Sequence, residues 1–239
     1  MSKKLGEKLV NVLYPRTCPI CENIVAKQEV YICEKCSGKL IKIRNPRCKK
    51  CGKPLENAKM EYCKDCGRHP HYYEEGRALW VYNKELRESI YRFKYDNKRE
   101  YADYYVSSIL NTYGSWIRRL NIQGVIPVPL HKKKKRARGF NQAQVLAEKL
   151  AEGLQLPIYT DFLVRQKNTR PQKELNEKER QKNLKNAFKV VQNDVQLNIV
   201  LLVDDIYTTG ATIDACSKLL KEQGVQKVYF ICLGTGGVS

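Results

Sequence analysis

Residues 199–212 read Ile-Val-Leu-Leu-Val-Asp-Asp-Ile-Tyr-Thr-Thr-Gly-Ala-Thr, and this pattern indicates the fold of the larger part of the chain. Its first five residues are apolar without alternation, which is typical of a central parallel strand covered on both faces. A helical pattern follows over 212–223 and ends at Gly224, a residue that favours the position after a helix. The stretch therefore predicts a strand, a short turn and a helix in succession.

The same alternation of strands and helices extends through the preceding residues. Apolar runs predict further strands at 77–82, 124–128, 158–164, 188–191 and 228–233. Helical spacing predicts helices at 84–95, 99–113 and 141–153. This alternation indicates an α/β fold with a largely parallel sheet and flanking helices, in which ligands bind at the carboxyl ends of the strands.

The polar residues after the 199–203 strand predict a phosphorylated ligand. Asp204 and Asp205 leave a buried strand, where their carboxylates can accept hydrogen bonds from neighbouring hydroxyls. The turn that follows presents hydroxyls and backbone N–H groups at a helix N-terminus, which suits a phosphate. Its residues are Thr208, Thr209, Gly210, Ala211 and Thr212. The combination predicts a ribose 5-phosphate; phospho-receiver domains also place two aspartates at a strand end, but they lack this turn.

Eight of the ten cysteines form four C-x-x-C pairs, and eleven residues separate each pair from the next. They are Cys18, Cys21, Cys33, Cys36, Cys48, Cys51, Cys63 and Cys66. A C-x-x-C turn directs two thiolates at one ion, and two such turns complete a closed tetrahedral site. Four pairs therefore predict two structural zinc ions. We expect the first pair to join the second and the third to join the fourth; an interleaved arrangement would use the same ligands, and iron–sulfur ligation is the less favoured alternative.

The cysteine pattern divides the chain into two domains. Residues 1–76 form the expected zinc module, and residues 77–239 form the expected α/β domain. A module of that size buries little apolar surface, so metal binding would supply its folding free energy.

The chain carries 44 Lys and Arg residues against 25 Asp and Glu residues, a formal net charge of +19. Such a surplus favours polyanionic partners such as nucleic acid or anionic lipid. Neither a signal-peptide pattern nor an apolar run of about 18 residues occurs in the sequence, so we expect a cytoplasmic protein. Leu5, Leu9, Val12 and Leu13 have helical spacing, and we expect them to pack on the zinc module, with contact to the inner face of a membrane as the alternative.

The 204–212 stretch resembles the signature that binds 5-phosphoribosyl-1-diphosphate (PRPP) in type I phosphoribosyltransferases. Three further segments narrow the match: Ile-Pro-Val-Pro-Leu-His at 126–131, Arg-Ala-Arg-Gly-Phe-Asn-Gln-Ala at 136–143, and a polar stretch over 165–188. With the zinc pairs in front, essentially the whole chain resembles the ComF (competence protein F) family, a double zinc ribbon followed by a phosphoribosyltransferase-type domain. No base-recognition hood is identified in the sequence.

The resemblance implies roles within a PRPP site. Asp204 and Asp205 would hold the ribose 2′- and 3′-hydroxyls, and residues 208–212 would surround the 5′-phosphate. Magnesium would bridge diphosphate and ribose oxygens. The loop after Pro129 would face the diphosphate, and residues 165–183 would close over the site.

Cations are predicted to meet the diphosphate. Lys132 to Lys135, with Arg136 and Arg138, place six cations within seven residues, and we expect them to form a loop after the 124–128 strand. Such a run can neutralise a diphosphate or contact a nucleic-acid backbone. In a catalytic site, Arg136, Arg138 and Arg165 would stabilise the leaving diphosphate.

The family resemblance implies a protein that supports the uptake of single-stranded DNA in natural transformation, working with a DNA-translocating helicase. Its ligands would then be PRPP and single-stranded DNA. Two other functions fit the same residues. One is an active phosphoribosyltransferase with an unassigned acceptor, and the other is a sensor that binds PRPP without turnover.

Overall fold

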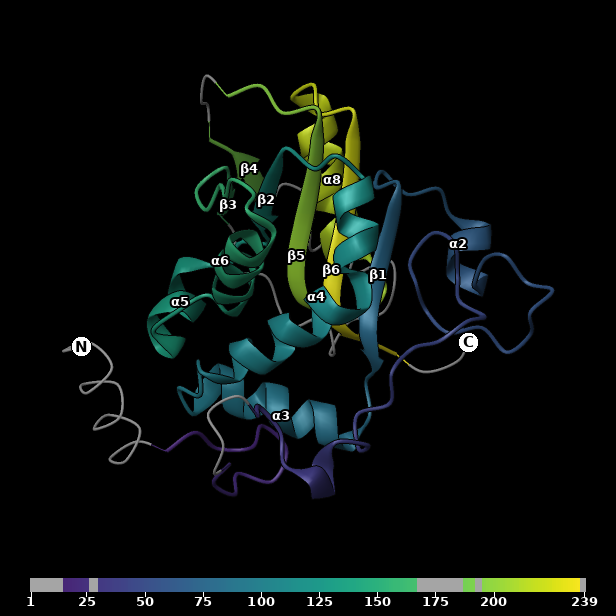
Figure 1. Ribbon diagram of the computed structural model, residues 1–239. Helices are drawn as coiled ribbons and strands as arrows, with labels where there is room; N and C mark the ends of the chain where they lie inside the picture. The colour runs from purple at the N-terminus through teal and green to yellow at the C-terminus, as the bar shows by residue number, and fades with distance from the viewer. Residues whose placement is uncertain (1–14, 26–29, 167–186, 192–194, 237–239) are drawn as a thin grey trace.

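The computed structural model describes residues 15–25, 30–166, 187–191 and 195–236. Its centre is a four-stranded sheet in the order β1–β6–β5–β2, in which all neighbouring strands are parallel (Figure 1). The strands are β1 (Glu75–Val81), β2 (Gly124–Pro127), β5 (Ile199–Tyr207) and β6 (Lys227–Thr235). The predicted α/β fold with a parallel sheet and flanking helices is confirmed.

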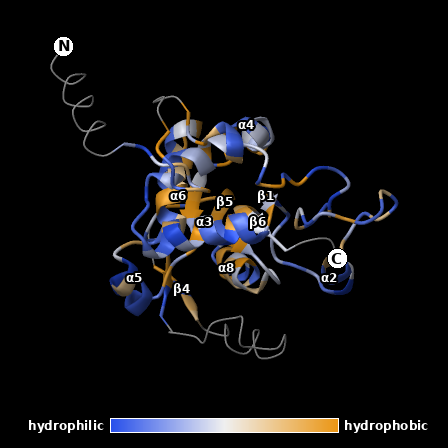
Figure 2. Cartoon of the chain, turned by 90° about the horizontal axis from the view of Figure 1, so that it is seen from below, coloured by the Kyte–Doolittle hydropathy of each residue, from blue (hydrophilic) through white to orange (hydrophobic). Residues whose placement is uncertain are grey.

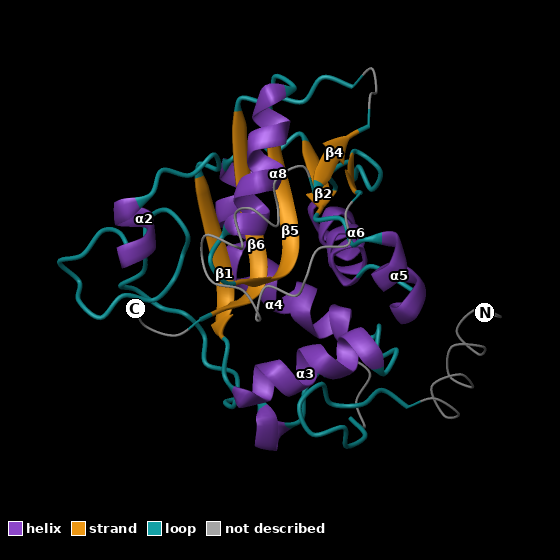
Figure 3. Ribbon diagram, turned by 180° about the vertical axis from the view of Figure 1, so that it is seen from behind, coloured by secondary structure: helices purple, strands orange, loops and turns teal. Residues whose placement is uncertain are grey.

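Helices cover both faces of this sheet, and the view from behind in Figure 3 shows α8 lying across β5 and β6. They are α4 (Tyr101–Arg119) and α6 (Gln142–Leu154) on one face and α8 (Ala211–Glu222) on the other. Alternate residues of β5 join the two layers: Leu201 and Val203 are buried in the core with α4 and α6, and Val200 and Leu202 are buried with α8. Burial on both faces explains why this strand lacks the alternation of a half-exposed strand.

Two helices lie near the carboxyl end of β5. α3 (Lys84–Tyr95) has the predicted bounds. The basic run that was expected as a loop is instead a helix, α5 (Lys132–Arg138), and that prediction was wrong. The side chain of His131 accepts a hydrogen bond from the first turn, and Gly139, at φ 81°, donates its N–H to the carbonyl of Lys135 over 2.8 Å. Because Lys and Arg are good helix formers, a run of them with caps at both ends forms a helix.

A short antiparallel pair, β3 (Leu163–Arg165) and β4 (Phe188–Val190), lies outside the main sheet. The strand predicted at 158–164 is thus largely absent, and Ile158 contributes an isolated parallel bridge to β2. Most of the predicted closing loop, 165–183, lies outside the described residues.

The zinc module packs along the edge of the sheet. Its short helices are η1 (Glu34–Cys36), a 3-10 helix, and α2 (Lys64–Arg68). The segment between the two cysteine groups pairs antiparallel with β1, and the N–H of Ile43 donates to the carbonyl of Leu79 over 3.1 Å. This pairing covers backbone groups that an edge strand would otherwise expose. β1 begins at Glu75, so the predicted boundary after residue 76 falls inside this strand.

No helix among the described residues is long and apolar enough to cross a membrane. The N-terminal stretch that contains Leu5, Leu9, Val12 and Leu13 lies outside the described residues.

Candidate zinc centres and ligand site

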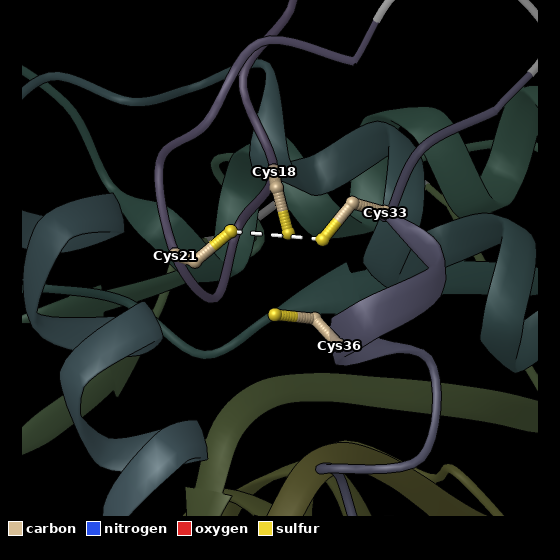
Figure 4. A group of neighbouring side chains, drawn as sticks. All are labelled: Cys18, Cys21, Cys33 and Cys36. Atoms are coloured by element: carbon tan, nitrogen blue, oxygen red, sulfur yellow. Dashed lines mark hydrogen bonds between the residues drawn. The ribbon is translucent and has the colours of Figure 1, made fainter.

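The eight paired cysteines form two groups of four, and within each group the sulfurs lie within 4.8 Å of one another. The sulfurs of Cys18, Cys21, Cys33 and Cys36 point toward a common centre in Figure 4. The Sγ atoms of Cys21 and Cys33 are 3.6 Å apart. Four sulfurs at about 2.3 Å from a tetrahedral zinc ion would be about 3.8 Å from one another, so the group fits zinc.

The second group has the same geometry, with 3.7 Å between the sulfurs of Cys51 and Cys63. Its members are Cys48, Cys51, Cys63 and Cys66. The first C-x-x-C pair therefore joins the second, and the third joins the fourth, as expected from the preferred arrangement. Two closed four-thiolate sites indicate structural zinc, because neither leaves a position for a substrate.

Each zinc ribbon is packed against the larger domain. In the second ribbon, Gly52 has φ 75°, and an added Cβ there would lie 2.7 Å from the carbonyl oxygen of Gly76 in β1. In the first ribbon, Arg92 of α3 donates from Nη2 to the carbonyl oxygens of Pro19 and Ile20, over 3.1 and 2.8 Å. The first ribbon therefore holds α3, and the second holds β1.

Asp204 and Asp205 lie at the carboxyl end of β5 but have different surroundings. Neighbouring residues of a strand point to opposite faces. The Asp205 carboxylate forms an ion pair with Lys94 of α3 and accepts a hydrogen bond from Gln142 Nε2 over 3.4 Å. Asp204 Oδ1 accepts from the backbone N–H of Asp205 over 2.8 Å, and its charge acts on Arg165.

These surroundings separate the pKa values of the two carboxyls. Burial and the charge of Asp205 raise the pKa of Asp204 well above its ordinary value. Burial alone would also raise the pKa of Asp205, but the charge of Lys94 and hydrogen bonds, including those from Lys94 and Gln142, outweigh burial and lower it. Asp205 is therefore the ionised member of the pair, and Asp204 takes up a proton more readily.

The turn between β5 and α8 has the features of a phosphate cradle. The hydroxyl oxygen of Thr209 is buried and has no hydrogen-bond partner among the described residues. Gly210 has φ 79° and precedes α8 without a side-chain cap, and the N-terminus of a helix is a favourable position for an anion. An added Cβ on Gly210 would overlap the Tyr207 hydroxyl, so this position requires glycine.

The segment from Arg138 to Gln142 connects the cations to the carboxylates. Arg138 Nη1 donates to Gln142 Oε1 over 2.7 Å, and the Gln142 amide then donates to Asp205. Asn141 caps α6 by accepting from the N–H of Ala143 over 3.1 Å, and its Nδ2 donates to the carbonyl of Val128 over 3.1 Å. The segment thus anchors α6 to the end of β2 and orients the Asp205 carboxylate.

Four cations converge beside the aspartates. They are Lys94 of α3, Lys134 and Arg138 of α5, and Arg165 at the end of β3. Burial, together with the charges of Arg165, Arg138 and Lys94, lowers the pKa of Lys134. Burial lowers the pKa of Arg165 as well, and the charge of Asp204 opposes this shift. An electropositive group of this kind suits a polyanion such as a diphosphate.

The other side of α5 faces outward. Lys132, Lys133, Lys135 and Arg136 are exposed there, and α5 is coloured almost entirely as hydrophilic in Figure 2. Of the three arginines predicted to meet a diphosphate, Arg138 and Arg165 lie at the converging group, whereas Arg136 lies on the outer side.

Two residues of this site, Lys94 and Gln142, are given no role by the sequence, and Lys134 is predicted only as one of the six cations of the basic run. The four-residue spacing of Lys134 and Arg138 would place both on one face of a helix. Because the run was predicted as a loop, nothing in the sequence indicated that the two side chains lie together. No comparable signal marks Lys94, because its partner Asp205 lies more than a hundred residues away along the chain.

Family models match two parts of the chain. A double zinc ribbon domain matches residues 9–67, and a phosphoribosyl transferase domain matches residues 138–238. The fold and the two sites therefore define a protein in which a double zinc ribbon is joined to a phosphoribosyltransferase-type domain.

Curated proteins to which the chain is similar include two competence proteins and a DNA utilization protein. Competence protein F of Haemophilus influenzae is 41% identical over 108 residues, which cover 44% of this chain and 47% of that protein. Competence protein ComFC of Bacillus subtilis is 30% identical over 151 residues, which cover 63% and 59%. The DNA utilization protein YhgH of Escherichia coli O157:H7 is 35% identical over 109 residues, which cover 46% and 48%. The chain spans about half the length of the curated relatives it matches.

Proposed function

We propose that this protein supports the uptake of single-stranded DNA in natural transformation and that its phosphoribosyltransferase-type domain binds PRPP. The observation that carries the PRPP part is a convergence at the carboxyl end of β5. Two aspartates, a buried hydroxyl at an uncapped helix N-terminus and four cations lie around this one strand end.

Each part of PRPP has complementary chemistry at this strand end. The Thr209 hydroxyl and the first N–H groups of α8 donate to the 5′-phosphate. Asp204 and Asp205 accept from the ribose hydroxyls. Lys134 and Arg138 face the diphosphate, and magnesium bound together with PRPP would neutralise part of its charge.

Binding of the ribose at Asp205 requires an exchange of partners. Without ligand, the carboxylate of Asp205 is paired with the ammonium group of Lys94. When a ribose hydroxyl donates a hydrogen bond to this carboxylate in place of Lys94, the Lys94 ammonium remains close to Lys134. It then adds a positive charge beside the diphosphate. The ion pair of Lys94 with Asp205 is therefore replaced by an ion pair of Lys94 with the diphosphate.

The DNA part of the proposal is supported by the names of the relatives and by charge. Two relatives are named as competence proteins and one as a DNA utilization protein. The chain has a formal net charge of +19, and the outer side of α5 presents exposed cations to solvent. A DNA-translocating helicase is the partner expected for this role.

A second candidate function is phosphoribosyl transfer, and the four converging cations favour it. The departing diphosphate accumulates negative charge, which Lys134, Arg138 and Arg165 would stabilise. Release of diphosphate in the presence of an acceptor would establish turnover. If the protein bound PRPP but released no diphosphate with any acceptor, its function would be that of a PRPP sensor.

Two binding measurements test the proposal. Calorimetry with magnesium should show tighter binding of PRPP than of ribose 5-phosphate, because only PRPP carries the diphosphate. Fluorescence anisotropy should show binding of labelled oligo(dT) at low salt, which weakens as salt is added. Absence of PRPP binding would contradict the proposal that PRPP is the ligand of this domain. Absence of oligo(dT) binding would contradict the proposed role in DNA uptake.

A further inference from the structure

A cavity of about 710 Å³ lies between α3 and α5, next to the proposed ribose site. Lys94 lines the cavity and also pairs with Asp205, and Ile206, the next residue of β5, lines it as well. The volume falls within the roughly 300–1,000 Å³ that small-molecule sites occupy. A group bound in this cavity would therefore lie beside a ribose held by Asp205.

Two exposed tyrosines lie at this cavity. Tyr91 and Tyr95 are one turn apart on α3, are 58% and 54% exposed, and have ring centroids 4.8 Å apart. Other tyrosines of this region, such as Tyr101 and Tyr105, are fully buried in the core. Packing within the protein thus explains the buried tyrosines but leaves this pair unexplained.

Arg138 fixes the orientation of one of these rings. Its guanidinium lies 4.8 Å from the centroid of the Tyr95 ring, and Nη2 donates to the Tyr95 hydroxyl over 2.9 Å. The same guanidinium donates to Gln142, which bonds to Asp205. One side chain thereby links the aromatic wall of the cavity to the carboxylate of the ribose site.

The charged groups of the wall select against cationic ligands. Arg87, Lys94, Lys134 and Arg138 contribute four positive charges, and Glu88 contributes one negative charge, which leaves a net charge of +3. An occupant that suits both the aromatic rings and these cations has a flat π face and carries negative charge.

We infer that this cavity binds a nucleobase of a single-stranded DNA chain, stacked on Tyr91 and Tyr95, while the neighbouring phosphates lie along the outer cations of α5. The inference rests on the proposed function, since it takes the DNA to be the strand held by the outer cations of α5. Those cations begin one residue away from the wall residue Lys134, so a strand that follows them reaches the cavity. Stacking on aromatic rings accepts any base, which suits uptake of DNA without sequence preference.

The test compares oligo(dT) with an abasic oligonucleotide of the same length, which keeps the phosphates and lacks the bases. The wild-type protein should bind oligo(dT) more tightly. Tyr91→Ala combined with Tyr95→Ala should weaken oligo(dT) binding by roughly 5- to 150-fold for each base that no longer stacks, and should leave abasic binding unchanged. Tyr91→Phe with Tyr95→Phe should retain the preference for oligo(dT), because both rings are kept. Tyr62→Ala is the matched control, since Tyr62 is 45% exposed and lies outside the cavity lining.

PRPP affinity distinguishes this inference from the proposed function. Tyr91→Ala alone should bind PRPP as the wild-type protein does, which also shows that its fold is intact, because the contact with Arg138 is made by Tyr95. Equal losses for oligo(dT) and the abasic strand would overturn the nucleobase site. If dTMP bound as tightly as oligo(dT), the ligand of the cavity would be a free nucleotide. That result would contradict the inference that the cavity binds a base of a DNA strand. If the wild-type protein bound oligo(dT) but not PRPP, the proposed ligand would fail and the nucleobase site would stand.

Discussion

The hydroxyl oxygens of Tyr73 and Tyr207 lie 2.8 Å apart and join the end of the zinc module to the end of β5. Both side chains are buried, and their rings meet edge to face at 6.4 Å. The Tyr207 hydroxyl also lies against Gly210, the residue of the phosphate turn that directly precedes α8. A direct chain of contacts therefore runs from the second zinc ribbon to the candidate phosphate cradle.

Tyr73→Phe should weaken PRPP binding and destabilise the protein. The substitution leaves the Tyr207 hydroxyl buried without its partner, at a cost of about 1–3 kcal/mol, and frees the ring that supports the turn. Calorimetry with PRPP and urea denaturation measure the two effects. Tyr72→Phe is the control, because Tyr72 is 45% exposed and its hydroxyl lies outside this buried pair. Wild-type values for Tyr73→Phe in both experiments would show that the contact has no role.

The protein should contain about two equivalents of zinc when it is purified without chelator, since two groups of four cysteines supply two ligand sets. Cys33→Ser and Cys63→Ser each remove a ligand from a different group, so each variant should lose up to one equivalent and become less stable. Mass spectrometry of the metal content checks both numbers. A value near one for the wild-type protein, or the visible absorption of an iron–sulfur cluster, would contradict the assignment.

Asp205→Asn should weaken PRPP binding by roughly 1.5–3 kcal/mol, because it removes a charge-assisted hydrogen bond to a ribose hydroxyl. Asp204→Asn should weaken PRPP binding less, because burial and the charge of Asp205 favour the protonated form of Asp204. Their effects on stability should differ. Asparagine resembles the protonated form that burial favours at Asp204. At Asp205 it also removes the ion pair with Lys94. Asp161→Asn, at an exposed position, serves as the control. Unchanged PRPP affinity in both variants would show that these carboxylates do not hold the ribose.

Lys94→Met should destabilise the ligand-free protein at neutral pH by roughly 1.5–3 kcal/mol, since it leaves the buried Asp205 carboxylate without its cation. Lys94 contributes to the lowering of the Asp205 pKa below the ordinary 3.8. The stability that this pair supplies is therefore complete above pH 3.8 and is lost as the pH falls through the lowered value.

Urea denaturation at neutral and acidic pH measures this difference. The gap between the wild-type protein and Lys94→Met should narrow in acid. Adding Asp205→Asn to Lys94→Met should restore part of the stability at neutral pH, because the unpaired charge is gone. Equal stability of Lys94→Met and the wild-type protein at neutral pH would contradict the pairing.

Local patterns in the sequence predict the zinc ligands, the central strand and the phosphate turn, because spacing along the chain determines each of them. The alternation of C-x-x-C pairs gives the two groups, and the apolar run before Asp204 gives β5. Helix α3 has the bounds that helical spacing predicts, and in the structure Asn83 caps its start, with Oδ1 accepting from the N–H of Leu86.

Contacts between distant segments could not be predicted in the same way. The pairing of Lys94 with Asp205, and of Tyr73 with Tyr207, depends on how α3 and the zinc module pack against the sheet. The basic run was misassigned because its composition suggested a solvated loop, whereas the caps at both ends make it helix α5. That helix divides the run into an inner and an outer face, and a loop would not do so.

The two faces of α5 should have separable functions. Replacing the exposed Lys132, Lys133 and Lys135 with glutamine should weaken binding of single-stranded DNA for all sequences and reduce the slope of log K against log salt by about 0.7 for each phosphate that is no longer neutralised. PRPP affinity should stay unchanged, because these side chains point away from the converging cations.

Lys134→Gln should lower PRPP affinity and leave the affinity for single-stranded DNA unchanged, since Lys134 lies among Lys94, Arg138 and Arg165. Anisotropy with oligo(dT) over a range of salt and calorimetry with PRPP measure the two effects. Loss of both activities in the triple variant would mean that DNA and PRPP share one surface, in which case PRPP would displace bound DNA.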